Sequence, residues 1–196
     1  MLKQFAFNSS VDKLRLTAYC WLPETESVRG LMVIAHGRAE HALRYQEFSE
    51  ALNAAGFAVY ALDHRGHGAS PGPQGLGDFG EGGWNALAED IAQLTELAKA
   101  ELPGVPTVLF GHSMGSFVSQ QFVLTHAGLI DALILSGSAA TDKLYVSMAA
   151  AEAAVLRGEA LSAFNIGFDQ RTGFEWLSRD EAQVDIYIYV PLCGFD

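Results

Sequence analysis

Residues 111–115, Gly-His-Ser-Met-Gly, are the part of this chain best suited to do chemistry, and they follow an apolar run directly. A serine hydroxyl is a poor nucleophile at neutral pH, so it needs a sharp strand-to-helix turn that exposes it to a base and to backbone N–H donors. Gly111 and Gly115 permit such a turn because glycine tolerates close approach and unusual dihedrals. The pattern predicts a nucleophile elbow with Ser113 as nucleophile and His112 as a packing residue that points away from the pocket.

A second turn, His36-Gly37-Arg38, follows the apolar run 31–35. An oxyanion hole is a pair of N–H donors that bind the negatively charged oxygen of the reaction intermediate, and a strand end near such an elbow can supply one of the two. We expect the donors to be the backbone N–H groups of Arg38 and Met114. Such donors contribute a few kcal/mol each to a developing tetrahedral oxyanion. Alone, this turn would be an ordinary strand end; its position before the elbow favours the functional interpretation.

The segment 63–70 contains Asp63, His64 and His67 in a glycine-rich loop. Two histidines three residues apart beside an aspartate raise the question of a metal site. No fourth ligand group or second cluster accompanies them, so we expect no metal. The segment is predicted to be a hydrogen-bonded turn that supports the site from behind.

The elements that must position these residues follow from hydrophobic spacing. Short apolar runs separated by stretches with helical spacing predict buried parallel strands with right-handed crossovers, which is an α/β architecture with a mostly parallel sheet and flanking helices. An antiparallel hairpin is expected first. The expected strands are 5–8, 14–22, 31–35, 58–62, 107–110 and 132–135; the expected helices are 48–55, 84–98 and one from the elbow to near Gly128, with His126 close to its C-terminal dipole.

The character of the chain changes after residue 138, where strand-like runs cease. Residues 1–138 are therefore interpreted as the core domain and 139–196 as a helical cap or lid. Within the cap, the alanine-rich stretch 143–156 is predicted to be helical, with an apolar face for packing that could also touch an acyl chain. A capping box over 178–181, Ser-Arg-Asp-Glu, predicts a further helix through about Ile188.

Composition narrows the function classes. The chain has 196 residues, 49% of them apolar, and a formal net charge of -11, which disfavours nucleic acid as a partner. Cys20 and Cys193 have no metal-binding or disulfide spacing and fit a reducing, cytoplasmic setting. The first residues lack the apolar core of a signal peptide, and no run approaches membrane-spanning length.

Three segments together resemble the monoacylglycerol lipase and lysophospholipase group of α/β-hydrolases. They are 36–41 with Arg44-Tyr45, 63–68 and 111–115. Residues 174–180 and 191–195 look like the end of the cap in bacterial members, so the resemblance covers essentially the whole chain. It implies an α/β-hydrolase fold and hydrolysis of carboxylic esters of glycerol or lysophospholipids through an acyl-enzyme at Ser113. It implies no metal or organic cofactor, and a cap that could contact a membrane surface transiently.

The chain departs from the pattern of that group in two respects. Val190 stands before Pro191 where that group usually has aspartate, and the catalytic acid and histidine are not found in their usual place. In that group the catalytic acid and histidine follow the cap, whereas here no histidine follows His126 and the late aspartates lie in or around the cap. We therefore assign no catalytic acid or base, expect the C-terminal strands of the fold to be missing from these residues, and expect the chain alone to be nearly inactive. The strand 132–135 would then be a bare apolar edge, which predicts self-association.

Two alternatives remain open at this stage. A serine peptidase or amidase of the same superfamily shares the elbow but usually needs a polar pocket for a free amine. A non-catalytic binding or interaction protein on the same scaffold is favoured by the missing acid and histidine. Ser113 stands where dehalogenases and epoxide hydrolases carry aspartate, which disfavours those two activities.

Overall fold

The structure is a computed structural model that describes residues 1–25, 27–140, 165, 167–169 and 171–195. The chain divides into two compact units. The first comprises Met1–Ser138 together with Phe195–Asp196, and the second comprises Ala139–Gly194. The predicted helix over 143–156 lies outside the described residues.

The first unit is built on a six-stranded sheet with the order β1-β2-β4-β3-β5-β6. The chain enters through an antiparallel hairpin, and β2 also pairs antiparallel with β4. The remaining neighbours, β4 with β3, β3 with β5 and β5 with β6, are parallel, so the expected mostly parallel sheet is confirmed. The strands are β1 (Leu2–Asn8), β2 (Arg15–Trp21), β3 (Gly30–Ala35), β4 (Phe57–Leu62), β5 (Thr107–His112) and β6 (Ala132–Ser136).

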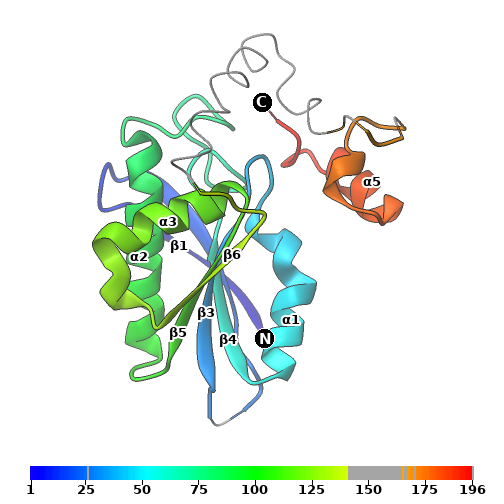
Figure 1. Ribbon diagram of the computed structural model, residues 1–196. Coiled ribbons are helices and arrows are strands. Elements are labelled where there is room, and N and C mark those ends of the chain that lie inside the picture. Colours follow the sequence, from blue (N-terminus) through cyan, green and yellow to red (C-terminus); the bar gives the residue numbers. More distant parts are fainter. Residues whose placement is uncertain (26, 141–164, 166, 170, 196) are drawn as a thin grey trace. The chain divides into compact units, whose positions relative to one another are not determined.

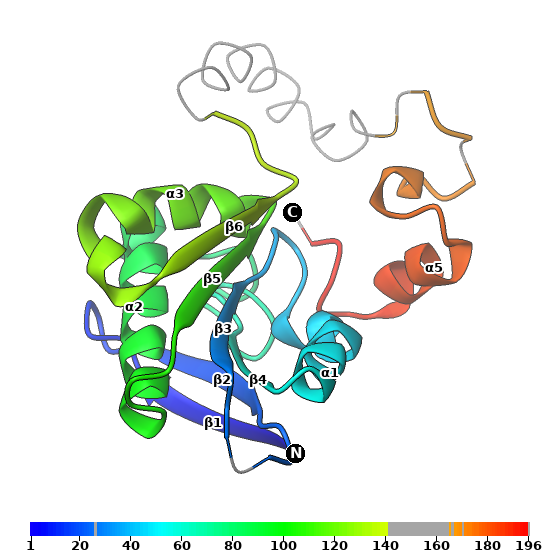
Figure 2. The ribbon, with the colours of Figure 1, turned by 60° about the horizontal axis from the view of Figure 1, so that its bottom comes forward.

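Helices cover both faces of this sheet. Figures 1 and 2 show α1 on one face and α2 and α3 together on the other. Each connects strands that run parallel, as the spacing of apolar residues predicts. The bounds are η1 (Ala42–Tyr45), α1 (Gln46–Ala54), α2 (Gly83–Glu101), α3 (Met114–His126) and η2 (Ala127–Leu129).

The apolar core lies in two layers, one on each face of the sheet. The larger layer packs strand residues such as Leu31 and Val33 against Leu94 of α2 and Phe122 of α3. The smaller layer joins alternate strand residues to α1 and includes Met32, Ile34 and Val59. Full burial of one such side chain stabilises the fold by about 1.5–3 kcal/mol. The layers hold the carboxyl ends of β3 and β5 in fixed register, which places the two predicted turns at one edge of the sheet.

The run 132–135 forms a strand that is not fully buried, and it lies at an edge of the sheet, as the sequence also predicted. Its neighbour β5 covers one edge of β6, and Leu133 packs against the larger core layer. Ile134 and Leu135, however, are 44% and 40% exposed. The reason is position: among the described strands β6 ends the sheet order, so β5 is its one strand neighbour there.

The second unit contains η4 (Glu175–Leu177) and α5 (Glu181–Tyr189). The helix begins at a different cap from the predicted one, because Asp180 is the N-cap residue and its Oδ1 accepts from Ala182 N at 3.0 Å. Ser178 instead accepts from Asp180 N through its Oγ at 3.1 Å, which prepares the turn before the helix. No helix in the described ranges is both long and apolar enough to cross a bilayer.

Candidate functional site

The turn between β5 and α3 is tight and centred on Ser113. This residue has φ 50° and ψ -119°, a conformation that is costly for a residue with a side chain. It is held by backbone hydrogen bonds: Ser113 N donates to Ser136 O at 2.9 Å, and Ser116 N donates to Ser113 O at 2.9 Å. The Ser113 side chain is half-buried, and its hydroxyl has no hydrogen-bond partner within the described part of the chain.

Gly111 and Gly115 are needed because backbone passes very close to both. A Cβ on Gly115 would overlap the carbonyl group of Ala35, at the end of β3. A Cβ on Gly111 would lie 2.6 Å from Gly115 O and 2.8 Å from Ser116 Cα. The start of α3 therefore sits against the end of β3 at a separation that only glycine allows.

This close approach brings the second predicted turn to Ser113. Gly37 lies between Glu40 and Ser113, so that a Cβ there would be 2.8 Å from Glu40 Oε1 and 3.3 Å from Ser113 Cβ. Arg38 follows with an exposed side chain, and Ala39 is buried with φ 54°. The two turns singled out in the sequence are neighbours in space.

Polar contacts hold the Gly37 turn on both sides. The His36 Nδ1 lies 2.7 Å from Gly37 O, and Gly37 N donates to Glu40 Oε1 at 2.5 Å. Glu40 is itself fixed, since Tyr45 donates to the same oxygen at 2.8 Å and Arg44 forms an ion pair with the other at 3.2 Å. Sequence reasoning gave Glu40 no role; its spacing of three residues from Gly37 and four from Arg44 is the signal that could have found it.

The loop 63–70 supports the site through Asp63. This buried carboxylate accepts from Ala42 N and Ala69 N, both at 2.8 Å, and from the Tyr19 hydroxyl at 3.3 Å. Burial raises the pKa of Asp63, and burial together with the nearby Asp63 charge raises the pKa of Tyr19 to about 12. The carboxylate thus links β2, the segment before α1 and its own loop.

His64 and His67 of the same loop are buried as neutral rings. Burial lowers the pKa of His64 to about 3 and that of His67 to about 4. The His64 ring nitrogens have no hydrogen-bond partner, and His67 Nδ1 lies 3.0 Å from Arg65 O. Across the described ranges, no cluster of three or more histidine, cysteine or acidic side chains is arranged to hold a metal ion.

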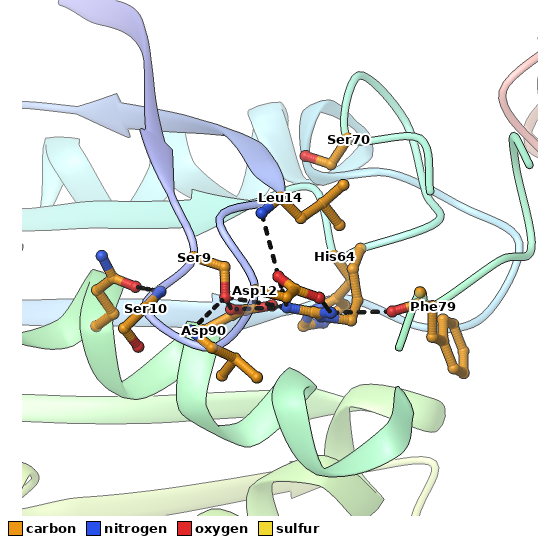
Figure 3. Close-up of polar contacts among 12 residues, drawn as sticks. Ser9, Ser10, Asp12, Leu14, His64, Ser70, Phe79 and Asp90 are labelled. Atoms are coloured by element: carbon orange, nitrogen blue, oxygen red, sulfur yellow. Dashed lines mark hydrogen bonds and ion pairs between the residues drawn. The ribbon is translucent and has the colours of Figure 1, made fainter. Parts of the chain in front are cut away.

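Arg65 anchors this loop in a buried ionic cluster that the sequence did not reveal. Its partners Asp12 and Asp90 are labelled in Figure 3. Its guanidinium donates to Asp90 of α2 at 2.8 Å, to Asp12 of the first hairpin at 2.7 Å and to Ser9 at 3.0 Å. A fourth partner is Phe79 O, at 2.9 Å. Asp90 lies 25 residues from Arg65 in the sequence and Asp12 lies 53 residues from it, so no local pattern identifies these partners.

Beside the turn lies a hollow of about 220 Å³. It is lined by Glu40, Arg44, Tyr45, Phe110 and His112. His112, predicted to be a packing residue that points away from the pocket, borders this hollow, and its Nδ1 lies 3.2 Å from Ser136 Oγ. The side chain that precedes Ser113 therefore contacts both β6 and the hollow.

His126 lies in the last turn of α3, as expected, and makes a further contact there. Its Nε2 lies 2.9 Å from Glu89 Oε1 of α2, so the ring links two helices and does not act only on the end of its own helix. The ring also packs against Phe122 at a centroid distance of 5.4 Å. The partner lies 37 residues away, which explains why sequence spacing did not reveal it.

The mostly parallel sheet, its helices and the two facing turns define an α/β-hydrolase. Residues 26–196 match the Hydrolase_4 family, described as "Serine aminopeptidase, S33", and the chain belongs to that family. It is 39% identical over 132 residues to a monoacylglycerol lipase of Mycolicibacterium smegmatis, covering 67% of this chain and 45% of the relative. It is 30% identical over 179 residues to the monoglyceride lipase of Homo sapiens, covering 88% and 54%.

Solved structures agree with this assignment. A thermostable carboxyl esterase from Bacillus coagulans, solved in complex with glycerol, superimposes with a TM-score of 0.81 at 27% identity. The match covers all of this chain and 67% of the esterase. The chain spans about half the length of the curated relatives named above.

Proposed function

We propose that this chain carries the nucleophile half of a serine hydrolase that cleaves carboxylic esters of monoacylglycerol or lysophospholipid, with Ser113 as nucleophile. The observation that carries the proposal is the conformation of Ser113, held at φ 50° on a strand-to-helix turn with Gly37 against it. The names of the relatives support the substrate class, since they include monoglyceride lipases and a probable lysophospholipase of Haemophilus influenzae.

In the proposed reaction, the Ser113 oxygen attacks the ester carbonyl carbon and the carbonyl electron pair moves onto oxygen. The oxyanion so formed accepts hydrogen bonds from the N–H groups of Met114 and Arg38. Met114 is suited to this because the first N–H groups of a helix have no intrahelical acceptor. Collapse of this tetrahedral intermediate breaks the bond between the carbonyl carbon and the alcohol oxygen, and the alcohol leaves with a proton. Water then hydrolyses the acyl-enzyme.

The proton of Ser113 needs a base, and no described residue accepts a hydrogen bond from its hydroxyl. Loss of the base from a serine triad typically lowers turnover on the order of a millionfold, whereas one oxyanion donor contributes about 10²–10³-fold. The 196-residue chain alone is therefore expected to turn over esters very slowly.

The test compares three proteins: the 196-residue chain, the chain extended to the next in-frame stop codon of its gene, and the extended form carrying Ser113→Ala. Each is assayed for hydrolysis of p-nitrophenyl butyrate and for labelling by a fluorophosphonate, in which the serine oxygen bonds to phosphorus and fluoride leaves. We expect fast turnover and labelling only in the extended form with Ser113 intact. Full activity in Ser113→Ala would reject Ser113 as nucleophile, and no reaction in any form would favour a non-catalytic binding protein.

A second candidate, a serine peptidase or amidase, is favoured by the description of the matched family as an aminopeptidase. It uses the same attack by Ser113 but expels an amine. An aminoacyl p-nitroanilide distinguishes the two: preference for the ester of monoacylglycerol by kcat/KM supports the lipase, and preference for the anilide supports the peptidase.

A further inference from the structure

The peptide that joins Gly37 to Arg38 is held at its carbonyl by the His36 imidazole. His36 Nδ1 lies 2.7 Å from Gly37 O, and His64 N donates to His36 Nε2 at 3.0 Å. A carbonyl oxygen can only accept and a backbone N–H can only donate. The two contacts together therefore require a neutral His36 ring with its proton on Nδ1.

The surroundings of His36 keep the ring in this state. It is fully buried, with the His64 and His67 rings 4.3 Å and 5.3 Å away between centroids. Burial, reinforced by these neighbours, lowers the pKa of His36 well below its usual value. A second proton would also remove the acceptor for His64 N–H, so the neutral ring persists at the pH of ordinary assays.

The consequence concerns the opposite side of the same peptide. In a trans peptide the carbonyl and the N–H point in opposite directions, so holding Gly37 O against His36 turns Arg38 N–H away from the buried ring. Gly37 itself lies against Ser113. We propose that His36 is a positioning residue whose Nδ1–H fixes the Gly37–Arg38 peptide with Arg38 N–H facing the oxyanion at Ser113. The inference rests on the proposed function.

Such a restraint is needed because glycine allows a peptide to rotate to orientations that a side chain would oppose. Glu40 holds only the preceding peptide, through Gly37 N. The His64 N–H that binds His36 lies next to Arg65 in the chain, and the Arg65 guanidinium binds the Asp12 and Asp90 carboxylates, which are labelled in Figure 3. His36 thus connects the loop that Arg65 anchors to the Gly37–Arg38 peptide, which must keep its direction.

Two substitutions separate the two hydrogen bonds of His36. In His36→Asn the amide nitrogen occupies the place of Nδ1 and can still donate to Gly37 O. In His36→Gln the amide reaches the place of Nε2 and can accept from His64 N but no longer restrains Gly37 O. Both remove the ring, so a purely structural role would affect them alike. A stability control is Leu94→Ala, a buried core change in α2 away from both turns.

The direction of the Gly37–Arg38 peptide is read in the 196-residue chain from crystal structures of the wild type and both variants. Kinetics with p-nitrophenyl butyrate are measured in whichever form turns over. We expect His36→Asn to keep the peptide direction and kcat within about tenfold. His36→Gln is expected to release the peptide and lower kcat about 10²–10³-fold with little change in KM, because the bond forms only in the transition state. Leu94→Ala should lose stability and retain kcat.

The proposal is overturned if the peptide keeps its direction in His36→Gln, or if the two folded variants lose kcat equally. It is also overturned if ¹⁵N NMR of the wild type shows the His36 proton on Nε2. The structural and NMR results hold whether or not any form hydrolyses esters, so failure of this inference is distinguishable from failure of the proposed function.

Discussion

Two residues of the candidate site, Ser113 and Ala39, carry side chains in the left-handed region of backbone space. The conformation of Ser113 could be predicted from the glycines on either side, whose spacing demands a sharp turn. That of Ala39 could not, because alanine favours helix and the predicted turn at 36–38 does not show that the residue after it takes a positive φ. Its φ of 54° follows from the contacts of Gly37 and Glu40, which close the turn around it.

The strain at Ala39 predicts an unusual response to substitution. A left-handed conformation costs a non-glycine residue about 1–2 kcal/mol, and a glycine at this position would be free of that cost. The gain is roughly offset because glycine loses the buried methyl group and makes the unfolded chain more flexible. We expect Ala39→Gly to change the free energy of unfolding by less than about 1 kcal/mol. Ala39→Val should destabilise by about 3 kcal/mol or more, because a β-branched side chain fits neither the dihedrals nor the buried space.

Urea unfolding of both variants beside Ala88→Gly checks this expectation. Ala88 is buried in the interior of α2, where glycine should cost about 1–2 kcal/mol. Equal losses in Ala39→Gly and Ala88→Gly would show that Ala39 is not strained.

Among the elements, the strands and helices of the first unit were largely predictable, while the contacts that join them were not. Buried parallel strands leave an apolar run in the sequence, and the helices between them leave a repeating apolar face, so β3, β4, β5, α1 and α2 were located within a few residues. The cluster of Arg65 with Asp12 and Asp90 joins a loop, a hairpin and a helix, and each pairing depends on the completed fold.

We expect the loop after β4 to make the stability of the first unit depend on pH. His64 and His67 have folded pKa values of about 3 and about 4, below the usual 6.5 of the unfolded chain. Between the folded and the unfolded pKa of each ring, the unfolded state binds more protons than the folded state. The free energy of unfolding therefore falls as the pH falls from 6.5 towards 4. Each ring contributes at most about 1.4 kcal/mol per pH unit. Asp63 has the opposite effect on the free energy of unfolding just above pH 3.8. Its pKa is raised in the folded state, so there the folded state binds more protons than the unfolded state.

Urea titrations at pH 7, 6 and 5 measure this slope. His64→Phe should be tolerated at pH 7, because neither ring nitrogen of His64 has a hydrogen-bond partner, and its backbone donor remains. The variant should lose less stability than the wild type on going to pH 5. An unchanged slope would mean that His64 takes up no proton on unfolding in this range.

At the scale of the whole molecule, β6 presents an edge that no described strand covers. Ile134 and Leu135 are 44% and 40% exposed there, and an apolar edge with free backbone groups pairs readily with another chain. We expect the 196-residue chain to form dimers or larger species as its concentration rises, in spite of a net charge of -11 that opposes association.

Size-exclusion chromatography with light scattering, run over a range of concentrations, tests self-association. Ile134→Lys places a charge on the edge strand and should shift the chain towards monomer. Leu124→Lys is the matched control, because Leu124 is 81% exposed on α3 and lies outside the edge strand. If both lysine variants shift equally, net charge or the α3 surface governs association instead of β6. A wild type that stays monomeric at every concentration would show that the charge outweighs the apolar edge.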